Sequence, residues 1–175
     1  MQKSKRFLTI LILILVVGTS LLYSNSLSPF WTIDLYGNEV DQTIFKNSKL
    51  TLINVWATFC PPCLMEMPDL AELSREYNTK DVQIIGIVND VYSPNQRVFE
   101  RNLQTAGSII MQTGAHYTHL IPSQDLYNLR LKDVQFVPET FFVDNTGKIV
   151  GKTVIGAKSK SEWKKIIEEN LKLVN

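Results

Sequence analysis

The sequence predicts an α/β fold in which a central mixed β-sheet carries helices on both faces. Two observations lead to this fold class. Buried-strand patterns alternate with amphipathic-helix patterns along most of the chain, which is typical of parallel strands joined by helices. Near the C-terminal end, two strand patterns follow each other across an Asn145-Thr146-Gly147 turn, which adds an antiparallel hairpin.

Hydrophobic periodicity and turn residues place the elements along the chain. Met67, Leu70 and Leu73 recur at spacings of three and four, which predicts an amphipathic helix. Ser159 and Glu162 predict a capping box at the start of the last helix. The full expected order is two short strands around a Gly37 turn (30–40), a strand (50–56), a helix from the cysteines, a strand (82–88), a helix from Ser93-Pro94 to about Gln104, a weaker strand (116–121), a short helix (124–131), the hairpin (140–144 and 148–155) and the last helix.

Length and charge limit the range of functions. The 175 residues suffice for one globular domain and one membrane segment, and are too few for two sizeable cores. Basic and acidic residues number 18 and 17, a formal net charge of +1, so nothing in the charge balance indicates nucleic-acid binding.

The N-terminal end has the pattern of a membrane-targeting segment. Residues 1–6 are basic and precede an uncharged apolar run, 7–23, which as a helix measures about 25 Å, the short end of what spans a bilayer. We therefore expect 1–6 to stay in the cytoplasm, 7–23 to anchor the chain in the cell membrane, and 24–29 to link the anchor to an extracytoplasmic domain of residues 30–175. Cleavage of the run as a signal peptide is the alternative, and leaves a secreted or periplasmic domain on the same side.

The chain has two cysteines, in the run Cys60-Pro61-Pro62-Cys63. Secreted domains stabilised by disulfides carry more cysteines at wider spacings. A bridge between residues this close restrains almost none of the unfolded chain, so it contributes little as a staple. A chemical role is therefore the better interpretation.

Cys60 falls where a strand pattern ends and a helix pattern begins. The free N–H groups and partial positive charge of a helix N-terminus stabilise a thiolate, which is the nucleophile of disulfide exchange. We expect Cys60 to attack and Cys63, one helical turn further on, to resolve the mixed disulfide. Pro61 and Pro62 fit because first-turn N–H groups have no helical partner to lose. Pro61 also removes a donor to the thiolate, which favours a more negative potential and a reductive direction.

The residues around the pair resemble the TlpA/ResA-like branch of the thioredoxin superfamily. The resemblance rests on Val-Trp-Ala-Thr-Phe-Cys-Pro-Pro-Cys at 55–63, on Glu-Met-Pro at 66–68, and on Phe-Val-Pro-Glu-Thr-Phe at 136–141, which is similar to the family's cis-proline segment. It implies a thioredoxin-like fold with an N-terminal hairpin and a central helix-strand insertion at about 94–121. It also implies a membrane-anchored, extracytoplasmic thiol-disulfide oxidoreductase that reduces its clients, with a cis Val137-Pro138 bond opposite Cys60.

The resemblance also implies partners. Members of the branch usually take electrons from a membrane thiol carrier of the CcdA/DsbD type, which is the expected upstream partner. Apocytochrome c, a methionine sulfoxide reductase or another protein with disulfides is the expected client, and the sequence does not choose among them. No metal, flavin or nucleotide cofactor is indicated, so the redox centre is expected to be the Cys60–Cys63 pair itself.

A set of apolar residues around the pair is expected to bind substrate. Trp56 is expected mainly to pack beneath the site and secondarily to shape the substrate surface. Phe59 stands where the branch usually has tryptophan, and the backbone of Val137 is expected to pair with an extended substrate. The predicted substrate-binding residues are Trp56, Phe59, Pro61, Pro62, Val137 and Pro138.

The resolving step needs a proton acceptor near Cys63. Asn54 stands six residues before Cys60, where thioredoxin has a buried aspartate, and an asparagine cannot accept a proton. Glu66, three residues after Cys63, shares a helix face with it and is expected to fill this role, although a charge that only complements the helix N-terminus is the alternative. Glu139, a charged residue in an otherwise apolar strand, is the rival.

The two cysteines could also bind a metal or carry out peroxidase chemistry. A copper carrier is the best alternative from another class, since both cysteines and either His116 or His119 could supply soft ligands. The copper carriers that share this fold space their cysteines by three residues, however, whereas here the spacing is two. A structural zinc site needs four ligands, and the histidines lie far along the chain. Peroxiredoxin chemistry needs a threonine and a proline at the positions of Ala57 and Ile53.

Overall fold

The computed structural model describes residues 25–77, 81–92 and 98–174. The expected membrane segment 7–23 and the expected helix start at Ser93-Pro94 lie outside these ranges. Within the described ranges, no helix combines the length and the apolar character needed to cross a membrane.

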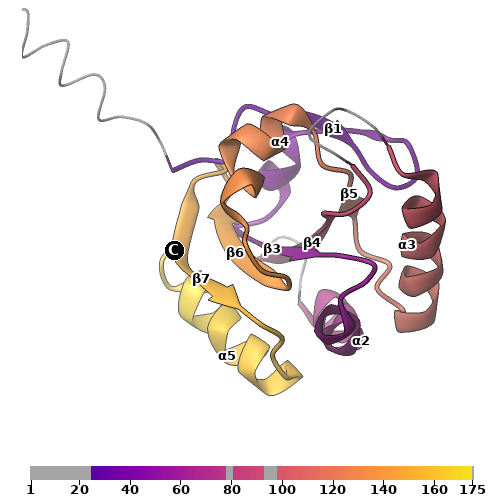
Figure 1. The fold of residues 1–175 in the computed structure, drawn as a ribbon. Helices are drawn as coiled ribbons and strands as arrows, with labels where there is room; N and C mark the ends of the chain where they lie inside the picture. Colours follow the sequence, from indigo (N-terminus) through magenta and orange to yellow (C-terminus); the bar gives the residue numbers. More distant parts are fainter. Residues whose placement is uncertain (1–24, 78–80, 93–97, 175) are drawn as a thin grey trace, which may run out of the picture.

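A five-stranded mixed sheet forms the centre of the domain, in the order β5-β4-β3-β6-β7 (Figure 1). β3 pairs in parallel with β4, and β4 with β5, whereas β6 runs antiparallel to both β3 and β7. The seven residues of β3 are all buried, as expected for a central strand covered on both faces. The strands are β3 (Leu50–Trp56), β4 (Val82–Val88), β5 (His119–Leu120), β6 (Glu139–Asp144) and β7 (Ile149–Ile155).

Helices cover both faces of this sheet, with α2 and α5 on one side and α4 on the other (Figure 1). The second face is also covered by a 3-10 helix, η1, whose Phe45 packs with Ile53 and Val55 of β3. A separate two-stranded sheet precedes β3. The remaining elements are β1 (Trp31–Ile33), β2 (Glu39–Asp41), η1 (Gln42–Asn47), α2 (Pro61–Glu76), α3 (Glu100–Thr113), α4 (Gln124–Leu129), η2 (Leu131–Asp133) and α5 (Lys160–Leu171).

The expected fold class is confirmed, including the N-terminal hairpin, the helix-strand insertion and the C-terminal hairpin. The capping box at Ser159 and Glu162 is also present. The predicted end of the next helix, at about Gln104, is wrong, because α3 continues to Thr113. It stops at Gly114, whose φ of 69° is the left-handed conformation that commonly ends a helix.

The strand expected at 116–121 is shorter than expected, since β5 contains His119 and Leu120 alone. It connects β4 to the N-terminal hairpin, because Asp34 forms a bridge to Leu120 and the N–H of Ile121 donates to the carbonyl of Ile33 at 2.9 Å. The short helix expected at 124–131 ends at Leu129, and η2 follows as a separate turn.

Candidate active site

A tight turn between β3 and α2 presents Cys60. The N–H of Cys60 donates to the carbonyl of Ala57 at 3.1 Å, and Cys60 is the N-cap of α2. Its Sγ accepts the N–H of Cys63 at 3.2 Å, so the sulfur itself caps the helix. Pro61 and Pro62 occupy the first two helical positions, where no N–H is needed.

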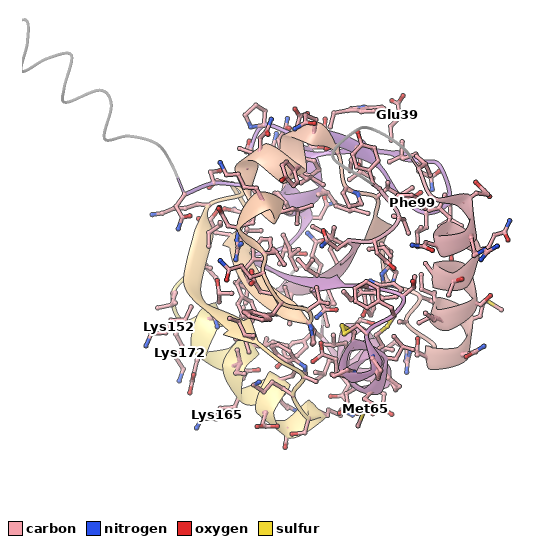
Figure 2. The ribbon with its side chains drawn as sticks, in the orientation of Figure 1. Glu39, Met65, Phe99, Lys152, Lys165 and Lys172 are labelled. Atoms are coloured by element: carbon pink, nitrogen blue, oxygen red, sulfur yellow. A yellow bond between two sulfur atoms is a disulfide. The ribbon has the colours of Figure 1, made fainter. Side chains whose placement is uncertain are left out.

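The two cysteine sulfurs form a disulfide, with the Cα atoms 5.3 Å apart. Cys60 is 5% exposed and Cys63 is fully buried. Cys60 is therefore the more accessible of the two cysteines. Figure 2 shows Met65, on the outer side of the same helix, pointing away from the sheet.

The peptide bond between Val137 and Pro138 is cis, as the sequence predicted. Val137 packs against the core cluster that contains both cysteines, so the structure brings this segment to the disulfide. Pro138 is buried, and its carbonyl accepts the N–H of Gly156 at 2.9 Å.

Exposed apolar side chains stand on both segments that surround Cys60. Phe59 is 74% exposed, and Phe136, next to Val137, is 64% exposed. Pro61 and Pro62 are also exposed. These four side chains are available for contact with another protein.

Trp56 does not belong to that surface. Its side chain is fully buried in the cluster beneath the disulfide, so it packs beneath the site and can shape the substrate surface only from below. Its indole N–H donates to His119 Nδ1 at 3.1 Å. Trp56 therefore supports the site through packing, in agreement with the main role expected from the sequence.

His119 is held as a neutral ring. Nδ1 accepts from Trp56, so Nε2 carries the proton and donates to the carbonyl of Ala115 at 2.8 Å. Burial lowers the pKa of His119 to about 4. Both nitrogens are engaged and His116 is exposed, and among the described residues no group of three metal-ligating side chains occurs. The structure does not bring either histidine to the cysteines as the copper alternative requires.

Glu66 is the buried carboxylate of the site, at 2% exposed. Its Oε1 accepts from Asn54 Nδ2 at 2.9 Å, and its Oε2 accepts from the Lys158 N–H at 3.0 Å and Trp163 Nε1 at 3.1 Å. Burial raises the pKa of Glu66, although these donors oppose the rise. A raised pKa makes the carboxylate a stronger base than an exposed glutamate, which suits a proton acceptor.

Asn54 is a site residue whose role the sequence did not reveal. Its amide nitrogen donates to Glu66 and also to Thr140 Oγ1, at 3.0 Å. In the register of the sheet, Thr140, Asn54, Gly86 and His119 stand in one row across four strands. A Cβ at Gly86 would lie 2.1 Å from His119 Nδ1, so the missing side chain is what gives the imidazole its space.

Glu139 is placed differently from Glu66. Glu139 pairs with Val55 of β3, and Val55 belongs to the core cluster on the face covered by α4. The preceding residue, Asn54, points to the other face, where it contacts Glu66. Arg130, at the end of α4, forms a partly buried ion pair with Glu139, and its guanidinium lies 4.8 Å from the centre of the Phe141 ring. The structure therefore places the expected rival base on the opposite face of the sheet from Glu66.

The model of the family described as Redoxin matches residues 24–167, most of the chain. The protein belongs to the Redoxin family. This Redoxin chain is 29% identical over 133 residues to a thiol-disulfide oxidoreductase ResA of Bacillus cereus, covering 76% of the chain and 69% of that relative. It is 34% identical over 107 residues to the thiol:disulfide interchange protein HelX of Rhodobacter capsulatus, covering 60% of the chain and 52% of HelX.

Solved structures agree with the fold. A thioredoxin-family thiol:disulfide interchange protein of Chlorobium tepidum superposes with a TM-score of 0.68 at 20% identity, over 85% of the Redoxin chain and 97% of its own. The exposed lipoprotein thioredoxin Etrx1 of Streptococcus pneumoniae gives 0.59 at 25% identity, over 81% and 99%. The Redoxin chain is thus a TlpA/ResA-like member of the thioredoxin superfamily and a thiol-disulfide oxidoreductase with a close cysteine pair.

Proposed function

We propose that this oxidoreductase reduces disulfides in extracytoplasmic client proteins with the dithiol form of Cys60 and Cys63. The observation that carries the proposal is the pairing of a reachable sulfur at the start of α2 with a fully buried one three residues later. This arrangement supports an order in which Cys60 meets the client and Cys63 acts afterwards, inside the protein.

In the first step the Cys60 thiolate attacks one sulfur of a client disulfide. The S–S bond of the client breaks, a new S–S bond joins Cys60 to the client, and the other client sulfur leaves. In the second step Cys63 loses its proton and attacks the Sγ of Cys60. The mixed disulfide breaks, the second client sulfur leaves, and Cys60 and Cys63 are oxidised to their disulfide. The client gains two electrons and takes up two protons, one from Cys63 and one from the solvent.

Glu66 is proposed to accept the proton of Cys63. The two residues share a face of α2, with a Cβ separation of about 5–6 Å at this spacing. Among the described hydrogen bonds Oε1 accepts from Asn54 alone, whereas Oε2 accepts from two donors. A carboxylate oxygen has two acceptor positions, so Oε1 retains one for the thiol of reduced Cys63.

The client is proposed to bind over the four exposed apolar side chains of Phe59, Pro61, Pro62 and Phe136. An extended client segment beside Val137 would place its disulfide over Cys60, with apolar side chains on the two phenyl rings. Apocytochrome c or a methionine sulfoxide reductase remains the proposed client. Electrons are proposed to return from a membrane dithiol carrier of the CcdA/DsbD type, and residues 7–23 to hold the domain at the outer face of the membrane.

Trapping tests the proposed order. With Cys63→Ser, Cys60 attacks but nothing resolves, so mixed disulfides to clients should accumulate in cells and disappear with dithiothreitol. The matched control, Cys60→Ser, should trap none, because the remaining sulfur is buried. Trapping by Cys60→Ser instead would reverse the assignment.

A further inference from the structure

The turn that presents Cys60 is held from the neighbouring strand by Asp90. Asp90 stands two residues beyond the end of β4. Its Oδ1 accepts the backbone N–H of Thr58 at 3.0 Å, and its Oδ2 accepts the Thr58 hydroxyl at 2.5 Å. One carboxylate therefore holds both the backbone N–H and the hydroxyl of a residue two positions before Cys60.

The same aspartate is tied to α3. Asn102 Nδ2 donates to the carbonyl of Asp90 at 2.7 Å and lies 3.4 Å from Asp90 Oδ2. The neighbouring N–H of Asn89 donates to the carbonyl of Trp56 at 2.8 Å. The end of β4 thus joins the first turn of α3 to the segment that runs from Trp56 into the active-site turn.

We propose that Asp90 is a positioning residue for disulfide exchange, which fixes the Cys60 turn and places a negative charge beside the Cys60 thiolate. This inference rests on the proposed function and deepens it by naming a residue that biases the cysteine pair toward reduction of its client. The role depends on the contact between Thr58 and Asp90, which joins two segments that are distant in the sequence.

The distance is short enough for the charge to act. Two residues of chain span at most about 7 Å, so the carboxylate lies within about 10 Å of the Cys60 backbone. This upper limit is roughly one Debye length at physiological ionic strength, so salt weakens the interaction without abolishing it. A negative charge at this distance raises the free energy of the thiolate and leaves that of the disulfide almost unchanged. The dithiol form is therefore less stable, and it passes its electrons on more readily.

Other titratable groups around the disulfide are arranged differently. Glu66, on the buried face of α2, accepts three hydrogen bonds. The His119 ring is neutral. Tyr92 and Tyr117 pack against the same core cluster. Asp90 is the carboxylate that holds the turn directly, so its effect on Cys60 can be separated from theirs by substitution.

Two substitutions separate charge from position. Asp90→Asn keeps the shape, because the amide oxygen can accept the Thr58 N–H and the amide nitrogen can donate to the Thr58 oxygen, while the charge is lost. Thr58→Ala removes the hydroxyl bond and keeps the charge. The matched control is Asp81→Asn, at the opposite end of β4, where the aspartate pairs with Lys49 on the surface.

The first measurement is the pH midpoint for alkylation of Cys60 by iodoacetamide, in full-length protein carrying Cys63→Ser. We expect Asp90→Asn to lower this midpoint by about 0.2–0.5 pH unit, the size of effect that one partly screened charge within about 10 Å produces. Thr58→Ala should leave the midpoint in place and slow alkylation, because the turn is looser. Asp81→Asn should change neither.

The second measurement is the equilibrium of the two-cysteine protein with glutathione. One S–S bond breaks in oxidised glutathione and one forms between Cys60 and Cys63, with two electrons and two protons transferred. We expect Asp90→Asn to shift this equilibrium about 1.5- to threefold toward the dithiol protein. Unchanged midpoint and equilibrium in Asp90→Asn would overturn the proposal. Failure of the wild-type protein to exchange with glutathione would instead remove the proposed function, while the alkylation midpoint would still decide the role of Asp90.

Discussion

Asn54 Nδ2 lies 2.9 Å from Glu66 Oε1, so the two residues form a buried hydrogen bond between the central strand and the helix that carries both cysteines. An amide in this position serves the carboxylate better than a second acid would. Two carboxyl groups this close could not both ionise. Asn54 therefore leaves Glu66 as the group that titrates beside Cys63, and orients it as well.

Replacement of Glu66 by Gln tests the proton transfer. The amide keeps the size of the side chain and cannot accept a proton, so release of client from the Cys60 mixed disulfide should slow by about 10²–10⁴-fold. The first attack by Cys60 should change little. Both rates can be measured in stopped-flow experiments with a fluorescent peptide disulfide, and release at the wild-type rate would assign Glu66 a purely structural role.

Glu139 should behave in the opposite way. Glu139→Gln leaves the partly buried Arg130 without its counter-charge, and the loss of such a partner costs about 1–3 kcal/mol of folding free energy. Release of client should keep its wild-type rate, because Glu139 faces away from Glu66. Urea unfolding measures the first effect and stopped-flow kinetics the second. As a control, Arg130→Met in the Glu139→Gln background should recover part of the lost stability. Slow release in Glu139→Gln would show that Glu139 is the base after all.

Gly86 should not tolerate a side chain. A Cβ there would overlap the His119 ring at 2.1 Å, and overpacking of this kind costs about 1–3 kcal/mol. Gly107→Ala is the matched control, because it adds the same methyl group within α3, where nothing lies within 4 Å of the added carbon. In this helix it should stabilise the protein by about 0.5–1 kcal/mol. Equal effects of the two substitutions in urea unfolding would contradict the packing of His119 over Gly86.

His119 should make the protein less stable in mild acid. Its pKa is lowered from 6.5 to about 4 in the folded state, mainly by burial, so the unfolded chain binds a proton that the folded chain does not. This contribution is complete above pH 6.5 and is lost as the pH falls toward 4, by about 3 kcal/mol in all. Glu66, with its raised pKa, has the opposite sign, and its contribution is lost as the pH rises above about 4.5.

Urea unfolding between pH 4 and 7 checks this prediction. His119→Asn should reduce the fall in stability below pH 6.5, and Glu66→Gln should make that fall steeper, because it removes the contribution of opposite sign. Equal changes in stability between pH 6.5 and 4 in the wild type and in His119→Asn would contradict the buried neutral state of His119.

Local features of the chain were predictable from sequence. β3 and β4 are short apolar runs, the capping box of α5 is a local pattern, and the cysteine pair carries its chemistry in its own spacing and position. The short length of β5 was not predictable, because its neighbours on either side, β4 and the hairpin at Ile33–Asp34, come from distant parts of the chain.

The environment of the two acids was not predictable either. β3 is buried on both faces, so its apolar pattern does not tell which face Asn54 takes. The same holds for Glu139 in β6, where five consecutive residues are buried. The register between these strands decides that Asn54 meets Glu66 and that Glu139 meets Arg130.

The reduction potential of the Cys60–Cys63 pair tests the reductive function most directly. It is obtained by equilibrating the full-length protein with glutathione redox buffers and quantifying the dithiol form by alkylation and mass spectrometry. Pro61, which offers no N–H to the thiolate, and the nearby Asp90 carboxylate both disfavour the reduced form. We therefore predict a potential near that of thioredoxin, about −270 mV. A value near that of DsbA, about −120 mV, would contradict the proposal and identify the protein as an oxidant.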